Sequence, residues 1–137
     1  MNEVSGFFNY YRFLSNFYPI EIEYEGLKYK NSEAAFQAAK VLGKKRKEFT
    51  KLSPRDAKRK GRRVFLRPDW KKIKDNVMYE IVKIKFSQRE LKEKLLLTGN
   101  MELIEENTWG DRYWGVCEGK GLNKLGKILM KVRKELS

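Results

Sequence analysis

The stretch from Ser32 to Lys40, SEAAFQAAK, most constrains the fold, because four alanines in nine residues suit a helix packed closely against its neighbours. At 100° per residue, Glu33, Gln37 and Lys40 fall within about 60° of one another on such a helix. Small or apolar side chains point the other way: Ala34, Ala38, Val41 and Leu42. We therefore expect the polar row to line a cleft. There a carboxylate, an amide and an amine can polarise a substrate bond, orient the substrate and attack it. The alternative is a solvated helix face with an i,i+4 pair.

The absence of histidine narrows the chemistry further. It excludes Ser-His-Asp and Cys-His catalysis, histidine-ligated metals and histidine general bases. The single cysteine, Cys117, excludes a cysteine-rich zinc site and an internal disulfide. We expect no metal and no cofactor. Catalysis has to come from carboxylates, lysine, arginine, tyrosine, amides and backbone groups.

Composition predicts one globular domain spanning residues 1–137, since 41% of the residues are hydrophobic and 13% aromatic. No apolar run approaches the roughly 20 residues that a membrane span needs. A signal peptide has a basic region before an apolar stretch, and the first residues show no such pattern. With only one cysteine, these features favour a cytoplasmic protein without a membrane partner. Oligomeric state is left open.

Positive charge is concentrated in one segment. Of the net charge of +13, a net +12 lies in residues 44–74, where fifteen basic residues stand against Glu48, Asp56 and Asp69. Such a field attracts polyanions, so nucleic acid or a nucleotide-like substrate is a candidate partner. The alternative is a compositional bias, because lysine is abundant throughout the chain.

The elements predicted from the pattern are mixed α and β. Residues 20–24 alternate as a half-buried strand does, and Glu25-Gly26 predicts a tight turn into a second strand over residues 27–29. The helix that follows begins near Ser32, which we expect as its N-cap. Ser53-Pro54-Arg55-Asp56 predicts a capped helix that ends near Gly61.

Three further helices are expected in the C-terminal half. One opens at Pro68-Asp69 with an apolar stripe from Trp70 to Ile84, and the next follows a capping box at Ser87–Glu90 and ends at Thr98-Gly99. A short strand is expected over residues 101–105 and an aromatic, glycine-bearing loop over residues 109–121. The last helix is expected to bury its apolar side chains: Leu122, Leu125, Ile128, Leu129, Val132 and Leu136.

A second chemical cluster is Trp109-Gly110-Asp111-Arg112-Tyr113-Trp114-Gly115. Tryptophans near an aspartate suit a flat ring held beside a carboxylate, and the alternative is a small core under the loop. Trp109 is expected first to pack. The run from Gly119 to Asn123 suits an approach to a helix N-terminus, and Leu14-Ser15-Asn16-Phe17 offers another amide and aromatic.

Taken together, these motifs resemble the YbiA/NADAR family. The resemblance extends from about Phe7 to Leu136 and is carried by motifs that occur in the same order: Leu14-Ser15-Asn16-Phe17, Ser32-Glu33-x-x-Phe36-Gln37-Ala38-x-Lys40, Asp69-Trp70, Val77-Met78, Leu97-Thr98-Gly99, Leu103-Ile104-Glu105, Asp111-x-Tyr113-Trp114-Gly115, and Gly121-x-Asn123-x-Leu125-Gly126-x-x-Leu129-Met130-x-x-Arg133. It implies a compact α+β fold with helices around a small β element. It also implies hydrolysis of N-glycosidic bonds in phosphorylated ribosides. The two implied substrate classes are ribosylamino-pyrimidine phosphates of riboflavin synthesis and ADP-ribose on guanine bases. One departure is Ala34, where family members usually carry histidine.

The implied catalytic residues are Glu33, Asp111 and Lys40. The two carboxylates would stabilise charge on the anomeric carbon and orient water, and Lys40 would be a nucleophile or a phosphate ligand. The implied substrate contacts are Trp114, stacking on the base or ribose, with secondary contacts from Asn16, Phe17 and Gln37. Asn123 would hold the loop or touch the substrate. The competing hypotheses are a non-catalytic nucleic-acid-binding module that uses the basic segment, and an enzyme relic that only binds ADP-ribose-like ligands.

Overall fold

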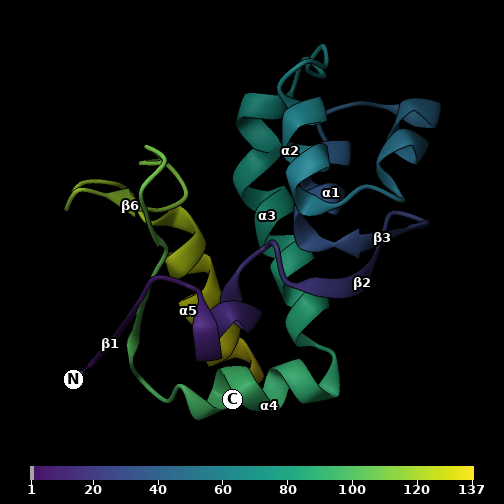
Figure 1. The fold of residues 1–137 in the computed structure, drawn as a ribbon. Coiled ribbons are helices and arrows are strands. Elements are labelled where there is room, and N and C mark those ends of the chain that lie inside the picture. Colours follow the sequence, from purple (N-terminus) through teal and green to yellow (C-terminus); the bar gives the residue numbers. More distant parts are fainter. Residues whose placement is uncertain (1) are drawn as a thin grey trace. The chain divides into compact units, whose positions relative to one another are not determined.

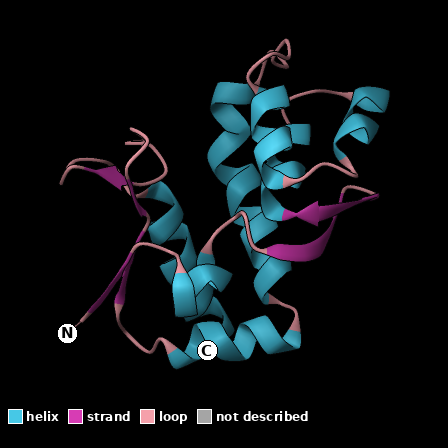
Figure 2. Cartoon of the chain, viewed as in Figure 1, coloured by secondary structure: helices cyan, strands magenta, loops and turns pink. Residues whose placement is uncertain are grey.

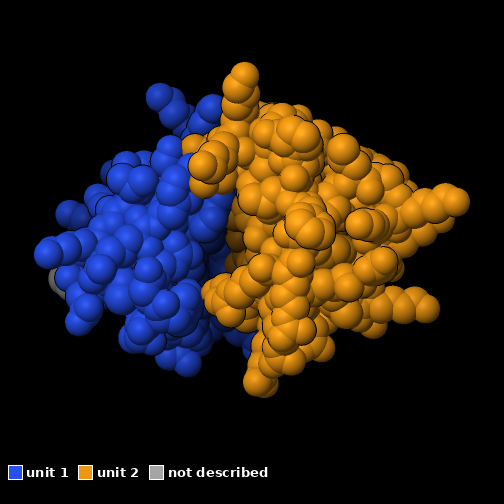
Figure 3. Space-filling view, turned by 90° about the horizontal axis from the view of Figure 1, so that it is seen from above, with its two compact units in different colours: residues 1–15, 86–137 blue, residues 16–85 orange. Residues whose placement is uncertain are grey.

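The computed structural model describes residues 2–137, which form two compact units (Figure 3). Unit 1 comprises residues 1–15 and 86–137, and unit 2 comprises residues 16–85. Helices predominate over strands in the ribbon, and all the strands are short (Figures 1 and 2). The fold is therefore α+β, as the sequence predicts. Among the described residues, no helix has the length and apolar character needed to cross a membrane.

The hairpin of unit 2 follows the alternating pattern closely. Strand β2 (Pro19–Tyr24) pairs antiparallel with β3 (Leu27–Asn31), and Tyr24 lies opposite Leu27. Glu25 and Gly26 both have positive φ, 48° and 88°, which a tight two-residue hairpin turn requires. The predicted turn is confirmed, and the second strand extends two residues beyond the predicted end at Tyr29.

Helix α1 (Ser32–Ala38) begins directly after this hairpin, and all seven of its residues are buried. Its N-cap is Asn31 rather than the predicted Ser32, because the Asn31 carboxamide oxygen accepts the Ala34 amide hydrogen at 2.7 Å. Helix α1 packs against β2, β3, α2 and the 3₁₀ helix η2 (Gly43–Phe49). Alanines on several sides of α1 permit these close approaches. The helix ends at Ala38, so Lys40 lies in the turn beyond it.

Helices α2 (Pro54–Gly61) and α3 (Trp70–Phe86) complete unit 2. Ser53 caps α2 by accepting the Asp56 amide hydrogen at 3.1 Å, as predicted. Trp70 packs its ring 5.2 Å from that of Phe36. The predicted apolar stripe of α3 is buried except at two positions that are half-buried, Ile73 and Ile84.

Unit 1 contains two small parallel pairings that the sequence pattern did not predict. Strand β1 (Glu3–Ser5) pairs with β4 (Glu102–Ile104), and β5 (Glu106–Asn107) pairs with β6 (Val116–Cys117). Strand β4 itself was predicted. The remaining elements are the 3₁₀ helix η1 (Asn9–Leu14) and the helices α4 (Arg89–Leu97) and α5 (Lys124–Leu136).

The helices of unit 1 differ from the predictions in two details. The N-cap of α4 is Gln88 rather than the predicted Ser87, and the Gln88 side chain makes no capping hydrogen bond. Leu122, predicted to be buried by the last helix, precedes α5 and is 49% exposed. The core of α5 instead rests on Leu125, Leu129 and Val132, which pack with β4 and α4.

Candidate active site

The sequence-predicted site residues fall into two groups, one in each unit. Unit 2 holds Asn16, Phe17, Glu33, Gln37 and Lys40. Unit 1 holds the other three: Asp111, Trp114 and Asn123.

The polar row of α1 is buried, so the solvated-face alternative is wrong. Glu33 is 8% exposed and Gln37 is 6% exposed. The Gln37 Nε2 donates to Glu33 Oε2 at 2.6 Å, which is the i,i+4 pair of the sequence pattern placed in the interior. The Glu33 backbone N–H donates to the Asn16 carbonyl at 3.1 Å, which joins the Asn16 main chain to the start of α1, while the Asn16 side chain donates to Met78 Sδ at 3.4 Å. A buried carboxylate held by an amide is positioned with little freedom to reorient.

Two buried polar atoms of α1 have no hydrogen-bond partner among the described residues. These atoms are Gln37 Oε1 and Ser32 Oγ. Leaving a buried polar atom unpaired costs about 1–3 kcal/mol, so these two atoms lower the stability of the packing around α1. Sequence reasoning assigned Ser32 to the cap. Because Asn31 takes the cap, the Ser32 hydroxyl is left buried without a hydrogen-bond partner among the described residues.

Gly61 supports the Gln37 side chain from the adjacent helix. A Cβ on Gly61 would lie 1.8 Å from Gln37 Oε1 and 2.6 Å from its Cδ. Only glycine therefore lets α2 approach the Gln37 amide this closely. Gly61 was predicted only as a helix end, and the tertiary contact had no signal in the sequence.

Lys40 is half-buried beside the same glycine. Its Nζ donates to the Gly61 carbonyl at 3.4 Å. Burial lowers the pKa of the Lys40 ammonium below its usual 10.5; the Glu33 carboxylate opposes this shift, and the cations Arg62 and Lys74 add to it. A lowered pKa increases the fraction of neutral amine, which is the nucleophilic form.

Phe17 contacts α2, which is rich in lysine and arginine. Its ring is partly exposed, and Lys58 Nζ of α2 lies 5.9 Å from the ring centroid. A cation over an aromatic face is favourable, and it places a positive charge beside the predicted substrate contact.

Asp111 organises the loop that carries the second group. Its Oδ1 accepts the backbone N–H groups of Tyr113 at 3.1 Å and Trp114 at 2.9 Å. The Asn107 carboxamide in turn accepts from the Asp111 amide at 3.0 Å and donates to its carbonyl at 2.9 Å. The half-buried Trp114 ring meets that of Tyr113 edge-on, with centroids 4.8 Å apart. The loop is therefore built around Asp111 and presents Trp114 from a hydrogen-bonded frame.

Asn123 is buried and ties β4 to the start of α5. Its Nδ2 donates to the Leu103 carbonyl at 3.0 Å, and its Oδ1 accepts the Glu105 amide hydrogen at 3.0 Å. Of its two expected roles, the contacts fit holding the loop. Trp109, which was expected to pack, is 62% exposed, so that expectation is wrong.

A buried carboxylate and amide beside a lysine of lowered pKa can carry out acid–base and nucleophilic chemistry, and here they lie in a small α+β fold. Residues 3–137 match the family model described as NADAR domain. The chain belongs to the NADAR domain family.

Relatives of known name agree with this assignment. The chain is 40% identical over 129 residues to N-glycosidase YbiA of Escherichia coli K12, covering 90% of this chain and 80% of that protein. It is 38% identical over 135 residues to an N-glycosidase of Nostoc punctiforme, covering 92% of this chain and 86% of the other. A riboflavin biosynthesis protein of Vibrio vulnificus is 40% identical over 131 residues, which are 90% of this chain but 35% of that protein.

The fold has a solved counterpart. The NMR structure of the Escherichia coli protein YbiA matches with a TM-score of 0.86 and 38% identity, covering 98% of this chain and 85% of the other. With relatives of this similarity over most of its length, the chain is an enzyme of the N-glycosidase type.

Proposed function

We propose that the chain hydrolyses the N-glycosidic bond of phosphorylated ribosides, with ADP-ribose attached to guanine bases as its substrate. The observation that carries the proposal is the buried Glu33–Gln37 pair beside the half-buried Lys40, in a chain 40% identical to named N-glycosidases. In the reaction, the bond between the anomeric carbon and the base nitrogen breaks. Water supplies a hydroxyl to the carbon and a proton to the nitrogen.

Glu33 is proposed to stabilise the positive charge that develops on the anomeric carbon. Charge stabilisation of this kind is strongest for a preorganised, desolvated group, and Gln37 holds the carboxylate in place. Asp111 keeps its proposed role as the second carboxylate, which orients or activates water. Trp114 keeps its role in stacking, and Asn16 and Phe17 theirs as secondary contacts.

Lys40 has two proposed roles. As a nucleophile, its neutral amine attacks the anomeric carbon, the bond to the base breaks, and the amine proton passes to the leaving nitrogen. The ring-opened sugar is then held as a Schiff base, which water hydrolyses to free the sugar and regenerate the amine. The lowered pKa of Lys40 supports this role. As a phosphate ligand, Lys40 would remain an ammonium and bind a substrate phosphate.

The charge distribution favours a base that is part of a nucleic acid. A net +12 in residues 44–74 exceeds what a ligand with two phosphates requires. The second candidate substrate is a ribosylamino-pyrimidine phosphate, and the name of the Vibrio vulnificus relative favours it. We further propose that residues 1–137 work as one domain, and that the protein acts in the cytoplasm, since its only cysteine is a buried free thiol.

Mass spectrometry of an oligonucleotide bearing ADP-ribosylated guanine tests the proposal. The wild type and the control Glu23→Gln, an exposed carboxylate of β2, should release intact guanine DNA and ADP-ribose. Glu33→Gln, which keeps the side-chain shape, should lose activity by about 100-fold or more. Turnover by Glu33→Gln near the wild-type rate would refute the assignment of Glu33.

Absence of release by the folded wild type would refute ADP-ribosylated guanine as the substrate. The same three proteins would then be assayed on ribosylamino-pyrimidine phosphates. Activity there, lost in Glu33→Gln, would retain the reaction and replace the substrate.

A further inference from the structure

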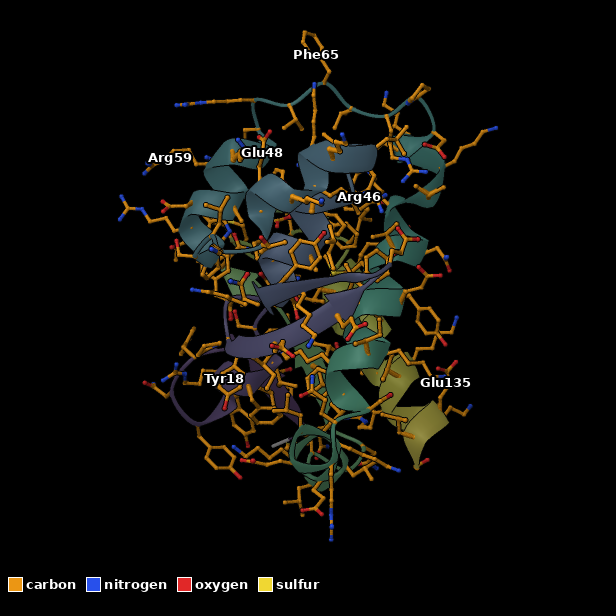
Figure 4. The ribbon with its side chains drawn as sticks, turned by 90° about the vertical axis from the view of Figure 1, so that its right-hand side faces the viewer. Tyr18, Arg46, Glu48, Arg59, Phe65 and Glu135 are labelled. Carbon is orange, nitrogen blue, oxygen red and sulfur yellow. The ribbon has the colours of Figure 1, made fainter. Side chains whose placement is uncertain are left out.

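The loop that joins α2 to α3, residues 62–69, carries the most exposed large apolar side chain among the described residues. Phe65 is 92% exposed, and its neighbour Leu66 is 50% exposed. Figure 4 shows Phe65 at the tip of the loop, directed away from the ribbon. A phenylalanine gains nothing for folding in this position, because its ring remains in water. We call residues 62–69 the Phe65 loop.

Four exposed arginines precede Phe65 in the sequence. Arg62 and Arg63 precede it, and both are exposed. Arg55 and Arg59 of α2 are exposed as well, and Arg59 extends outward in Figure 4. None of these four guanidinium groups forms an ion pair with a residue that the structure describes. Of the three acidic residues in the segment 44–74, Glu48 pairs with Lys60 and Asp69 with Arg67, and only Asp56 of α2 forms no ion pair with a described residue.

Two hydrogen bonds connect Lys40 to the Phe65 loop and to the residue that precedes it. At its start, the Gly61 carbonyl accepts from Lys40 Nζ at 3.4 Å. At its end, the Arg67 amide donates to the Lys40 carbonyl at 2.9 Å. Arg67 is itself held by two hydrogen bonds to the Asp69 carboxylate, at 2.7 and 3.1 Å. The hydrogen bonds of Lys40 connect the Phe65 loop to this residue of the candidate site.

We propose that the Phe65 loop is a nucleic-acid contact in which Phe65 stacks on a base next to the modified nucleotide while Arg62 and Arg63 bind the flanking phosphates. This proposal rests on the proposed function and extends it by assigning the residues that distinguish a polynucleotide from a free nucleotide. Every base offers a face to an aromatic ring, and arginine contacts to phosphates give sequence-independent affinity. An enzyme that acts on a base in a duplex has to extrude the nucleotide, and an apolar side chain can fill the vacated space.

The charge argues for this partner over an apolar protein surface. Four exposed guanidinium groups without acidic partners match a chain of phosphates. An anionic membrane surface also attracts cations beside an apolar tip, and it is the competing outcome of the test.

Fluorescence anisotropy with an unmodified, fluorescein-labelled single strand of about 15 nucleotides measures the contact without catalysis. Phe65→Ala should weaken binding by about ten-fold or more, and Phe65→Trp should restore it. The matched control is Leu97→Ala, which shortens an exposed apolar side chain of α4 and should bind as the wild type. Arg62→Ala/Arg63→Ala should reduce the slope of log binding constant against log salt concentration by the equivalent of about two phosphate contacts. Its control, Lys127→Ala/Lys134→Ala on the exposed side of α5, removes the same charge elsewhere.

Activity provides the second readout. On ADP-ribosylated guanine, Phe65→Ala should lose activity selectively on the oligonucleotide relative to the mononucleoside. Binding that is equal in Phe65→Ala, Leu97→Ala and the wild type would overturn the proposal. So would Phe65-dependent binding to phosphatidylserine vesicles without Phe65-dependent binding to DNA. If the wild type cleaves neither substrate but its DNA binding depends on Phe65, the contact stands and the proposed function fails.

Discussion

Replacing Gly61 with alanine tests the packing that holds the candidate site. The new Cβ would lie 1.8 Å from Gln37 Oε1, 2.6 Å from Cδ and 3.2 Å from Cβ of the same side chain. Gln37 is 6% exposed, so its amide has little room to swing aside. Moving it breaks the 2.6 Å hydrogen bond to Glu33.

The expected free-energy change combines three effects. Overpacking costs about 1–3 kcal/mol and the lost hydrogen bond about 1 kcal/mol. Replacing glycine by alanine in a helix stabilises the helix by about 0.5–1 kcal/mol, which offsets part of this loss. Gly61→Ala should therefore destabilise the protein by about 1–3 kcal/mol, a decrease in Tm of about 3–9 °C. Thermal unfolding followed by circular dichroism measures it, and N-glycosidase activity should fall as Glu33 loses its support.

A double-mutant cycle with Gln37→Ala separates this contact from any general effect on α2. With the amide removed, only the 3.2 Å approach to the Cβ of residue 37 remains of these three contacts, and Gly61→Ala should become much less destabilising. An equal loss of stability in both backgrounds would refute the reasoning. A wild-type Tm for Gly61→Ala alone would refute it as well.

Other features of the structure lead to further expected outcomes. Asn123→Ala removes both hydrogen bonds to the backbone of β4 and its neighbour, and should cost about 2 kcal/mol in urea unfolding. Asn31→Ala removes the cap and the hydrogen bond to the Leu52 carbonyl and should cost about 2 kcal/mol, whereas Ser32→Ala should cost nothing, since Asn31 makes the cap and the buried Ser32 hydroxyl has no partner among the described residues. Burial lowers the pKa of Lys85 to about 7. Below pH 7 both the folded and the unfolded states are protonated, and above it only the unfolded state keeps the proton. Stability should therefore rise by about 2 kcal/mol between pH 7 and 9, and Lys85→Met should remove this rise.

Local patterns predicted the elements whose determinants lie within a few residues. The β2–β3 hairpin follows from alternation and from Glu25-Gly26, and α2 follows from Ser53 and Pro54. The α1 cap was misplaced by one residue because Asn31 and Ser32 are both good caps. The choice between them depends on the chain direction at the end of β3. The parallel pairs of unit 1 were missed because strands of two or three residues have no measurable period.

The sequence predicted only the part of the candidate site that depends on the local pattern of residues. The alanines indicated that Glu33 and Gln37 would be buried, and they are. The role of Gly61 was not visible, because it depends on a contact between two helices. Lys85 lies on the buried side of α3, four residues after Ile81, yet it was left out of the predicted core. A lysine at such a position usually extends its amine to water, and only the packed structure reveals that it is 1% exposed.

The two roles proposed for Lys40 make opposite demands on the Phe65 loop. Arg62 belongs to that loop and is one of the cations that lower the pKa of Lys40. A phosphate bound by Arg62 would offset its charge and raise the pKa of Lys40 again, as the Glu33 carboxylate already does. A bound polynucleotide would therefore favour the ammonium form, which suits a phosphate ligand. A nucleophilic Lys40 needs its proton taken up by a neighbouring group once the strand is in place, and Glu33, whose charge already acts on the Lys40 amine, is the carboxylate suited to receive it.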